Sequence, residues 1–268
     1  MIEPIRRRLA GARWSDPLLL LELFLVSNVA FLAVDIAMAH AINAFANPLE
    51  WVPIAFSVAG AAILLVAMVL GGPVPTLSAQ ETGRPGAGRR LVARWLGFLV
   101  GAGAVVVGVA GVILHLDSQF FEDQTLKSLV YTAPFAAPLA YAGVGLLLIL
   151  DRMVDSRTVE WARWVVLMAL GGFVGNFVLT LADHAQNGFF AATEWIGVVA
   201  AALAVGFLTA VVVVVDNRPL LRLCGVVLGL QGAVGVLGFG LHVAANLARP
   251  AASLWDRFLY GAPAFAPL

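Results

Sequence analysis

The chain has 268 residues, of which 61% are hydrophobic and 12% are charged, and its mean hydropathy is +0.94. So little polar surface excludes a soluble globule of this size and indicates an all-α integral membrane protein whose main partner is the lipid bilayer. The formal net charge is zero, and nothing in the composition indicates binding to nucleic acid. Cys224 is the single cysteine, which excludes an internal disulfide and any multi-cysteine metal or iron–sulfur site.

Apolar runs that are long enough to cross a hydrocarbon core of about 30 Å predict seven full transmembrane helices. They lie near residues 17–45, 51–70, 94–116, 128–150, 164–185, 195–215 and 223–246. The connector 71–93 contains several glycines and prolines, which predict a flexible, helix-breaking link. An eighth apolar run begins near Leu254 and stops at Leu268, so the eighth helix is short or truncated.

Positive charges gather on one side of this predicted topology. The N-terminus and the loops after the second, fourth and sixth helices hold thirteen of the sixteen Lys and Arg residues: Arg6, Arg7, Arg8, Arg13, Arg84, Arg89, Arg90, Arg94, Arg152, Arg157, Arg163, Arg218 and Arg222. The other side holds Lys127, Arg249 and Arg257. By the positive-inside rule, we expect the protein in a cell's inner membrane with a cytoplasmic N-terminus.

An internal duplication organises the chain. His, Asn, Phe, Glu and Trp recur at identical spacing in residues 40–51 and 184–195, and Gly-x2-Gly-x2-Leu-His occurs at 108–115 and 235–242. We therefore predict two parallel four-helix repeats about an axis along the membrane normal. Around them the predicted organisation is a basic cytoplasmic N-terminus at 1–16, a first repeat at 17–150, a cytoplasmic linker at 151–163 and a second repeat, with an incomplete last helix, at 164–268.

All four histidines fall near the outer end of an odd-numbered predicted helix, namely His40, His115, His184 and His242. Imidazole is a versatile metal and haem ligand, so these residues are the predicted cofactor and metal ligands. The alternative is four interfacial histidines that each form a hydrogen bond to a neighbouring helix. The sequence leaves open whether the histidines pair within one half or across the two halves.

The glycines that precede His115 and His242 leave a bare helix surface beside each imidazole. This surface has room for a flat ligand such as a porphyrin or for a second helix, and for the glycines alone helix packing is the better interpretation. Two Gly-x3-Gly pairs, at 97–101 and 225–229, are also predicted packing sites.

Asp35 and Asp183 lie within predicted helices, where a carboxylate is costly unless it has a partner. We predict that they are auxiliary metal ligands or orient the imidazoles, and the alternative is that they only join helices. Second-rank candidates are the paired residues Asn43, Asn187, Glu50, Glu194, Tyr131 and Tyr260. For Glu50 the sequence also predicts a capping box with Asn47 and Pro48. Paired prolines at 134, 138, 263 and 267 should bend the fourth and eighth helices.

No hydrolase, kinase or dinucleotide-binding signature is present, and the sequence leaves open whether the protein is an enzyme. The first functional hypothesis is a protein that binds haem b or a transition metal for redox or metal handling. The second is a proton- or cation-coupled transporter that uses Asp35 and Asp183. The third is a membrane scaffold or assembly subunit that has no site and binds other membrane subunits.

The final apolar run is too short to cross the bilayer. From Leu254 the remaining 15 residues rise only about 22 Å as a helix, less than the hydrocarbon core of about 30 Å. We therefore expect the sequence to be a truncated form of a longer protein, in which the eighth helix continues by about three turns into a basic cytoplasmic tail.

Overall fold

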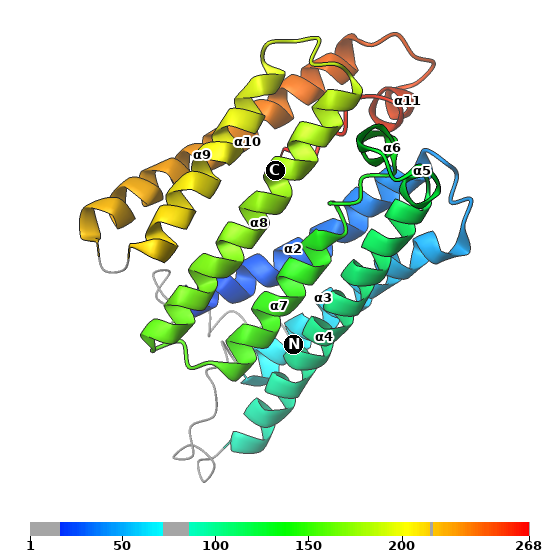
Figure 1. The fold of residues 1–268 in the computed structure, drawn as a ribbon. Coiled ribbons are helices and arrows are strands. Elements are labelled where there is room, and N and C mark those ends of the chain that lie inside the picture. The colour runs from blue at the N-terminus through cyan, green and yellow to red at the C-terminus, as the bar shows by residue number, and fades with distance from the viewer. Residues whose placement is uncertain (1–16, 72–85, 215–216, 268) are drawn as a thin grey trace. The chain divides into compact units, whose positions relative to one another are not determined.

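The structure, a computed structural model, describes residues 17–71, 86–214 and 217–267. Every regular element within these ranges is helical (Figure 1). The elements are α2 (Pro17–Ala41), η1 (Pro48–Glu50), α3 (Trp51–Gly71), α4 (Ala87–Asp117), α5 (Phe120–Asp123), α6 (Leu126–Tyr131), α7 (Leu139–Met153), α8 (Val159–Gln186), α9 (Glu194–Val213), α10 (Arg218–Ala248) and α11 (Leu254–Leu259). The described residues exclude most of the 71–93 connector and Leu268. They also exclude five of the arginines used for the topology prediction, namely Arg6, Arg7, Arg8, Arg13 and Arg84.

Six of the described helices are long and apolar enough to cross a membrane: α2, α3 together with η1, α4, α8, α9 and α10. Their lengths of 20 to 31 residues follow from the thickness of the hydrocarbon core. The chain is thus helical, with the composition of a protein that lies in a lipid bilayer. Six of the seven predicted full spans have a counterpart among these helices.

The predicted span at 128–150 is not one helix. Helix α6 ends at Tyr131, and α7 begins only at Leu139 and has 15 residues. Pro134 and Pro138 lack the N–H groups that a continuous helix would use, and each disfavours a helical conformation in the residue before it. The expected bend is therefore a complete break. The same change follows α11, where residues 260–267 are not helical and Pro263 and Pro267 occupy the equivalent positions.

The chain forms two compact units, which we call unit 1 and unit 2. Unit 1 contains residues 1–36, 47–108 and 141–165, and unit 2 contains residues 37–46, 109–140 and 166–268. Helices α2, α4, α7 and α8 contribute residues to both units. The boundaries run across the two predicted halves, because parts of the first half at 37–46 and 109–140 belong to unit 2.

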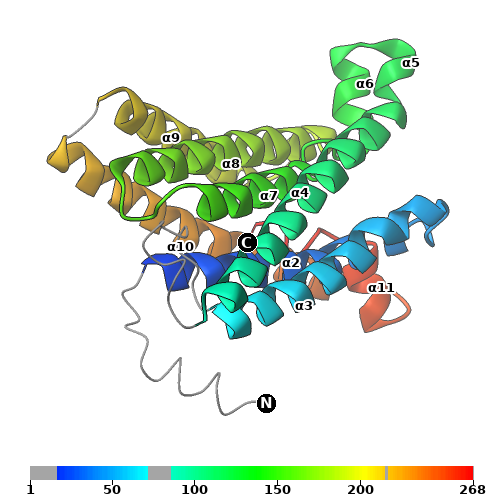
Figure 2. The same cartoon turned by 90° about the horizontal axis from the view of Figure 1, so that it is seen from below.

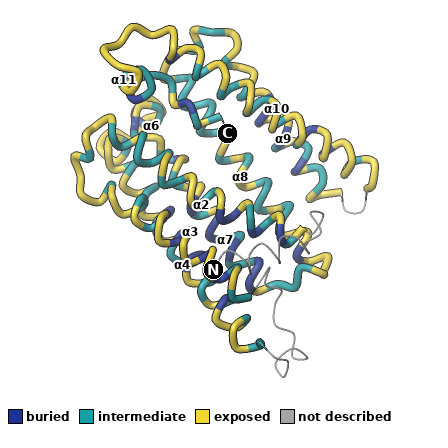
Figure 3. Tube along the Cα trace, turned by 180° about the vertical axis from the view of Figure 1, so that it is seen from behind, coloured by how far each residue is buried: buried dark blue, intermediate teal, exposed yellow. Residues whose placement is uncertain are grey.

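The core of unit 1 lies where α2, α3, α4 and α7 meet (Figure 3). It is built from buried aliphatic side chains, including Leu25, Leu64, Val100 and Leu148. Helices α4 and α7 approach closely at Gly101 and Gly145, where a Cβ on either glycine would meet the carbonyl oxygen of the other. Since lipid tails are as apolar as leucine, such close backbone packing is what favours association of helices in a membrane. The predicted packing role of the glycine pair at 97–101 is confirmed.

In unit 2, α10 packs along α9 and also contacts α11. The short helices α5 and α6 lie side by side just beyond the end of α4 (Figure 2). The Gln231 side-chain amide on α10 donates a hydrogen bond to the Ala200 carbonyl on α9 at 3.0 Å. At Gly225 and Gly229 an added Cβ would meet nothing within 4 Å. Among the described residues, nothing therefore packs against this second glycine pair, and its predicted packing role stays a prediction.

The duplicated His-x2-Asn-x-Phe sequence forms the same turn after α2 and after α8. The His40 carbonyl accepts hydrogen bonds from the backbone N–H groups of Asn43 and Phe45, at 3.3 and 3.2 Å. In the second turn, the His184 carbonyl accepts from the same two positions, at 3.2 and 3.1 Å. Left-handed conformations occur at Ala44 (φ 56°) and at the matching Gly188 (φ 71°). The turn is therefore a glycine-type helix end, which the first half builds with alanine.

Replacing Ala44 by glycine is expected to stabilise the protein by about 0.5–1 kcal/mol, because glycine adopts the left-handed conformation without the steric cost of a Cβ. Both positions are exposed, so the substitution changes no packing. Thermal unfolding in detergent should show a higher Tm for Ala44→Gly. The matched control Gly188→Ala should lower the Tm by a similar amount. Equal Tm values for the wild type and both variants would contradict a steric cost of alanine in the left-handed conformation.

Candidate functional site

All four histidines belong to unit 2. His40, His115 and His184 lie in the last turns of α2, α4 and α8, and His242 lies near the end of α10, which terminates at Ala248. Each imidazole is thus carried at the end of a long helix, as the sequence predicts. Rigid helices fix the backbone of all four residues.

The structure brings the histidines together in two pairs, each within one predicted half. The ring centres of His40 and His115 lie 6.2 Å apart at an interplanar angle of 83°. The ring centres of His184 and His242 lie 6.4 Å apart at 70°. Two imidazoles that share an ion have ring centres about 5–6.5 Å apart when metal–nitrogen bonds are near 2.0–2.1 Å. Both observed separations lie at the upper end of that range, which corresponds to ligands on nearly opposite sides of an ion.

Backbone carbonyls fix the tautomer of three of the four imidazoles. His115 donates from Nδ1–H to the Pro134 carbonyl at 2.9 Å, and His242 donates from Nδ1–H to the Pro263 carbonyl at 2.8 Å. His184 donates in the same way to the Thr180 carbonyl at 2.9 Å. A carbonyl oxygen can only accept, so Nδ1 must carry the proton. In the neutral ring Nε2 then keeps its lone pair, which is the arrangement of a histidine that binds a metal.

The breaks at the prolines create these carbonyl acceptors. Inside a continuous helix the Pro134 carbonyl would accept the amide four residues later. In the structure it accepts the Ala137 N–H at 3.1 Å and also the His115 imidazole. Pro263 repeats the pattern, with the Ala266 N–H at 3.3 Å and His242. In both predicted halves, the first proline of each pair thus supplies the carbonyl that accepts the imidazole N–H.

The bare glycine surfaces beside His115 and His242 are covered by the second proline of each pair. A Cβ at Gly111 would lie 2.8 Å from Pro138 Cβ, and a Cβ at Gly238 would lie 2.7 Å from Pro267 Cβ. Close packing therefore occurs at both glycines, but its partner is a proline in a turn and not the second helix that the sequence predicted. The space that the sequence offered to a porphyrin at these two surfaces is filled by the pyrrolidine rings.

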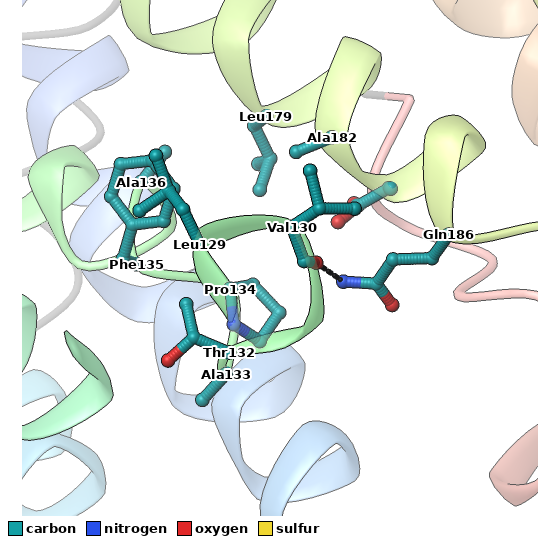
Figure 4. A pocket seen from close by; sticks show the side chains of 11 residues that line it. Leu129, Val130, Thr132, Ala133, Pro134, Phe135, Ala136, Leu179, Ala182 and Gln186 are labelled. Carbon is teal, nitrogen blue, oxygen red and sulfur yellow. Dashed lines mark hydrogen bonds between the residues drawn. The ribbon is translucent and has the colours of Figure 1, made fainter. Parts of the chain in front are cut away.

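Asp35 and Asp183 are half-buried. The orienting role expected of them is taken, for His115, His184 and His242, by the backbone carbonyls. Asp183 lines a small pocket in unit 2, between α8 and the segment that follows α6 (Figure 4). Gln186 closes one side of this pocket through a hydrogen bond from Nε2 to the Val130 carbonyl at 2.5 Å (Figure 4). The rest of its lining is largely apolar, including Leu129, Phe135 and Leu179.

The second-rank candidates have structural roles. Asn43 Oδ1 accepts the Phe45 N–H at 3.1 Å within the turn after α2. Asn187 Nδ2 donates to the Asp183 carbonyl at 3.5 Å. The capping box predicted for Glu50 is confirmed, because its carboxylate accepts the Asn47 N–H at 3.3 Å and Asn47 Oδ1 accepts the Leu49 N–H at 3.0 Å.

Glu194 copies the bond of Glu50, accepting the Ala191 N–H at 3.3 Å. Phe189 stacks on Trp195 with ring centres 4.1 Å apart. Tyr131 and Tyr260 are each 52% exposed, so both side chains face outward. Of the second-rank candidates, only Asn43 and Asn187 thus belong to the turns that follow histidine-bearing helices.

Sequence reasoning missed the carbonyl partners of the imidazoles and a buried charge cluster in unit 1. Arg152 Nη1 contacts the Glu22 carboxylate and lies 2.7 Å from Asp151 Oδ2. The signal for this cluster was Glu22 itself, a carboxylate inside an otherwise apolar run of α2. A charge in such a run requires a partner, and Arg152 on α7, 130 residues away in the chain, supplies it.

Within the described ranges, no group of three or more His, Cys, Asp or Glu side chains is arranged to hold a metal ion. Each histidine pair therefore offers two protein ligands and leaves other coordination positions open. No protein-family model matches the chain, and no curated protein or solved structure matches it either.

Proposed function

We propose that the protein binds transition-metal ions through its two histidine pairs and that it handles metal at the outer face of a cell's inner membrane. The observation that carries this proposal is the commitment of Nδ1 to a backbone carbonyl in His115, His184 and His242. That arrangement leaves Nε2 as a basic ligand in each pair. Imidazole suits zinc, copper, nickel and iron.

We infer that the two sites derive from an internal duplication and that the repeats run parallel in the membrane. The equivalent contacts support this inference. His115 with Pro134 and Gly111 with Pro138 have counterparts in His242 with Pro263 and Gly238 with Pro267. The distribution of Lys and Arg then favours a cytoplasmic N-terminus and places the histidines on the outer side.

A metal ion is a better occupant than haem, because the prolines cover the glycine surfaces that a porphyrin would need. Two imidazoles alone make an open site, in which water or cargo completes the coordination shell. An open site exchanges its ion more readily than a closed structural site, which suits metal handling. A tetrahedral ion would require each pair of rings to approach by about 1 Å, whereas a square-planar ion such as Cu²⁺ accepts ligands on opposite sides.

The experiment is titration of the purified, metal-stripped protein with Cu²⁺ and with Zn²⁺, followed by equilibrium dialysis and elemental analysis. We expect two ions per chain for the wild type, one ion for His115→Ala and one ion for His242→Ala. The double variant should bind none while keeping the Tm of a folded protein. Asn187→Ala is the matched control, because it alters a turn in unit 2 without removing an imidazole.

Three outcomes would overturn the proposal. A Soret band with near-stoichiometric haem would establish haem binding instead. Cation or proton uptake into proteoliposomes that survives His115→Ala and is lost in Asp183→Asn would favour the coupled transporter, since Asp183 lines the pocket in unit 2. Absence of any bound ion, with a wild-type phenotype for the variant lacking all four histidines, would favour a scaffold that binds other membrane subunits.

A further inference from the structure

Three ionisable side chains in unit 1 form a buried cluster that the proposed function does not use. Arg152 on α7 donates from Nη1 to the Glu22 carboxylate on α2 and to Asp151 Oδ2, the latter at 2.7 Å. Each of the three residues is only 1% exposed. The cluster therefore has to balance its charges without solvent.

The charges of these three groups do not balance if all are ionised. Arginine keeps its proton in proteins, so Arg152 contributes one positive charge against two carboxylates. Both carboxylates use the same guanidinium nitrogen, and among the described residues no hydrogen bond reaches Glu22 Oε2 or Asp151 Oδ1. A buried carboxylate without compensation is unfavourable, and such a group takes up a proton instead.

Within the described ranges, no second positive charge acts on the cluster. Trp161 of α8 lies beside Asp151, and Gly97 of α4 makes room for the guanidinium, since a Cβ there would clash with it. Among the described residues, the charged groups that act on the cluster are its own three members. Asp151 also lies near the end of α7, where the helix dipole disfavours a negative charge.

We propose that this cluster is a proton-binding site in which Glu22 and Asp151 share one exchangeable proton at neutral pH. Arg152 then neutralises the carboxylate that remains. Two carboxylates held close together share a proton because both cannot ionise at once. A metal cation fits less well, because it needs several oxygen ligands and the cluster offers two unpartnered carboxylate oxygens. Glu22 lies on α2 and the other two on α7, so the proton governs how firmly these helices are held together.

Infrared difference spectroscopy of the intact protein tests the proton directly. At neutral pH we expect one absorption band of a buried carboxylic acid, which shifts when H₂O is exchanged for D₂O. The band should disappear in Glu22→Gln and in Asp151→Asn, because each variant keeps one carboxylate and needs no proton to balance Arg152. Absence of the band in the wild type at neutral pH would overturn the proposal, as would a band that is unchanged in both variants.

The pH dependence of unfolding provides a second readout. The folded protein would bind one more proton than the unfolded chain once the pH exceeds the ordinary carboxyl range at about 4, so its stability should fall as the pH rises from there through neutrality, until the shared proton is lost. The folding constant should decrease up to tenfold per pH unit in the wild type, relative to Asp151→Asn. Equal slopes in the two proteins would contradict the shared proton. Stabilisation of the wild type by Na⁺ without the acid band would assign the site to a metal cation and overturn the proposal as well.

Discussion

Replacing Arg152 by methionine should lower the free energy of unfolding by about 3–5 kcal/mol, the largest effect that we expect from a single substitution in this protein. The methionine leaves Glu22 and Asp151 facing each other without a cation, and both carboxylates are buried. The ion pair between Arg152 and Glu22, which this substitution removes, also joins α7 to α2. Unfolding in a denaturant series in detergent, followed by circular dichroism, measures the change.

The matched control replaces all three charged residues together, as Glu22→Met, Asp151→Leu and Arg152→Met. Replacing a complete buried ion cluster by apolar side chains of similar volume is often neutral or stabilising. The triple variant should therefore recover most of the stability that Arg152→Met loses. If the single and the triple variant are equally unstable, the loss comes from packing around the guanidinium and not from uncompensated charge.

The second large effect is expected for Gly145→Ala, which should destabilise unit 1 by about 3 kcal/mol. An alanine Cβ at this position would lie 2.5 Å from the Gly101 carbonyl oxygen and 2.8 Å from the Val105 backbone nitrogen. Both are backbone atoms of α4, so neither can move aside by changing a rotamer. The two helices would have to separate, which opens the core around Val100 and Leu148.

Gly143→Ala is the matched control, because it lies on the same helix and its Cβ would meet nothing within 4 Å. In this position alanine should be neutral or slightly stabilising, since it favours the helix more than glycine does. Tm values for the two variants distinguish close packing from helix propensity. A Gly145→Ala variant as stable as Gly143→Ala would show that α4 and α7 do not touch there.

The long helices could be predicted from the sequence because the bilayer sets their length and composition. The apolar runs near 51–70 and 195–215 lie close to α3 (Trp51–Gly71) and α9 (Glu194–Val213). The break between α6 and α7 was predicted only as a bend. An apolar run that contains two prolines has the same composition whether the helix bends or breaks. The contacts that accompany the break, of Pro134 with His115 and of Pro138 with Gly111, are seen only in the structure.

The sequence could indicate which histidines are candidates for the site, but it could not predict which of them lie close together. The spacing of the duplicated stretches identifies His40, His115, His184 and His242, and symmetry allows pairs within or across the halves equally well. In the structure, the histidine pairs form within each predicted half. The sequence could not predict which backbone carbonyl accepts each Nδ1–H. Every residue has such a carbonyl, and only the fold determines which one lies beside the imidazole. For the buried cluster, Glu22 indicates that a cation is needed, but the sequence does not identify Arg152 as that cation, because the two residues lie on helices far apart in the chain.

X-ray absorption spectroscopy at the zinc edge, on protein loaded with Zn²⁺, tests the central claim most directly. If the histidine pairs hold the ion, each zinc should have two imidazole nitrogens at about 2.0–2.1 Å, with lighter ligands completing the shell. In His115→Ala the zinc content should halve, and the zinc that remains should keep two imidazole nitrogens. Zinc that is retained without imidazole scattering, or a wild-type protein that retains no zinc, would contradict the account.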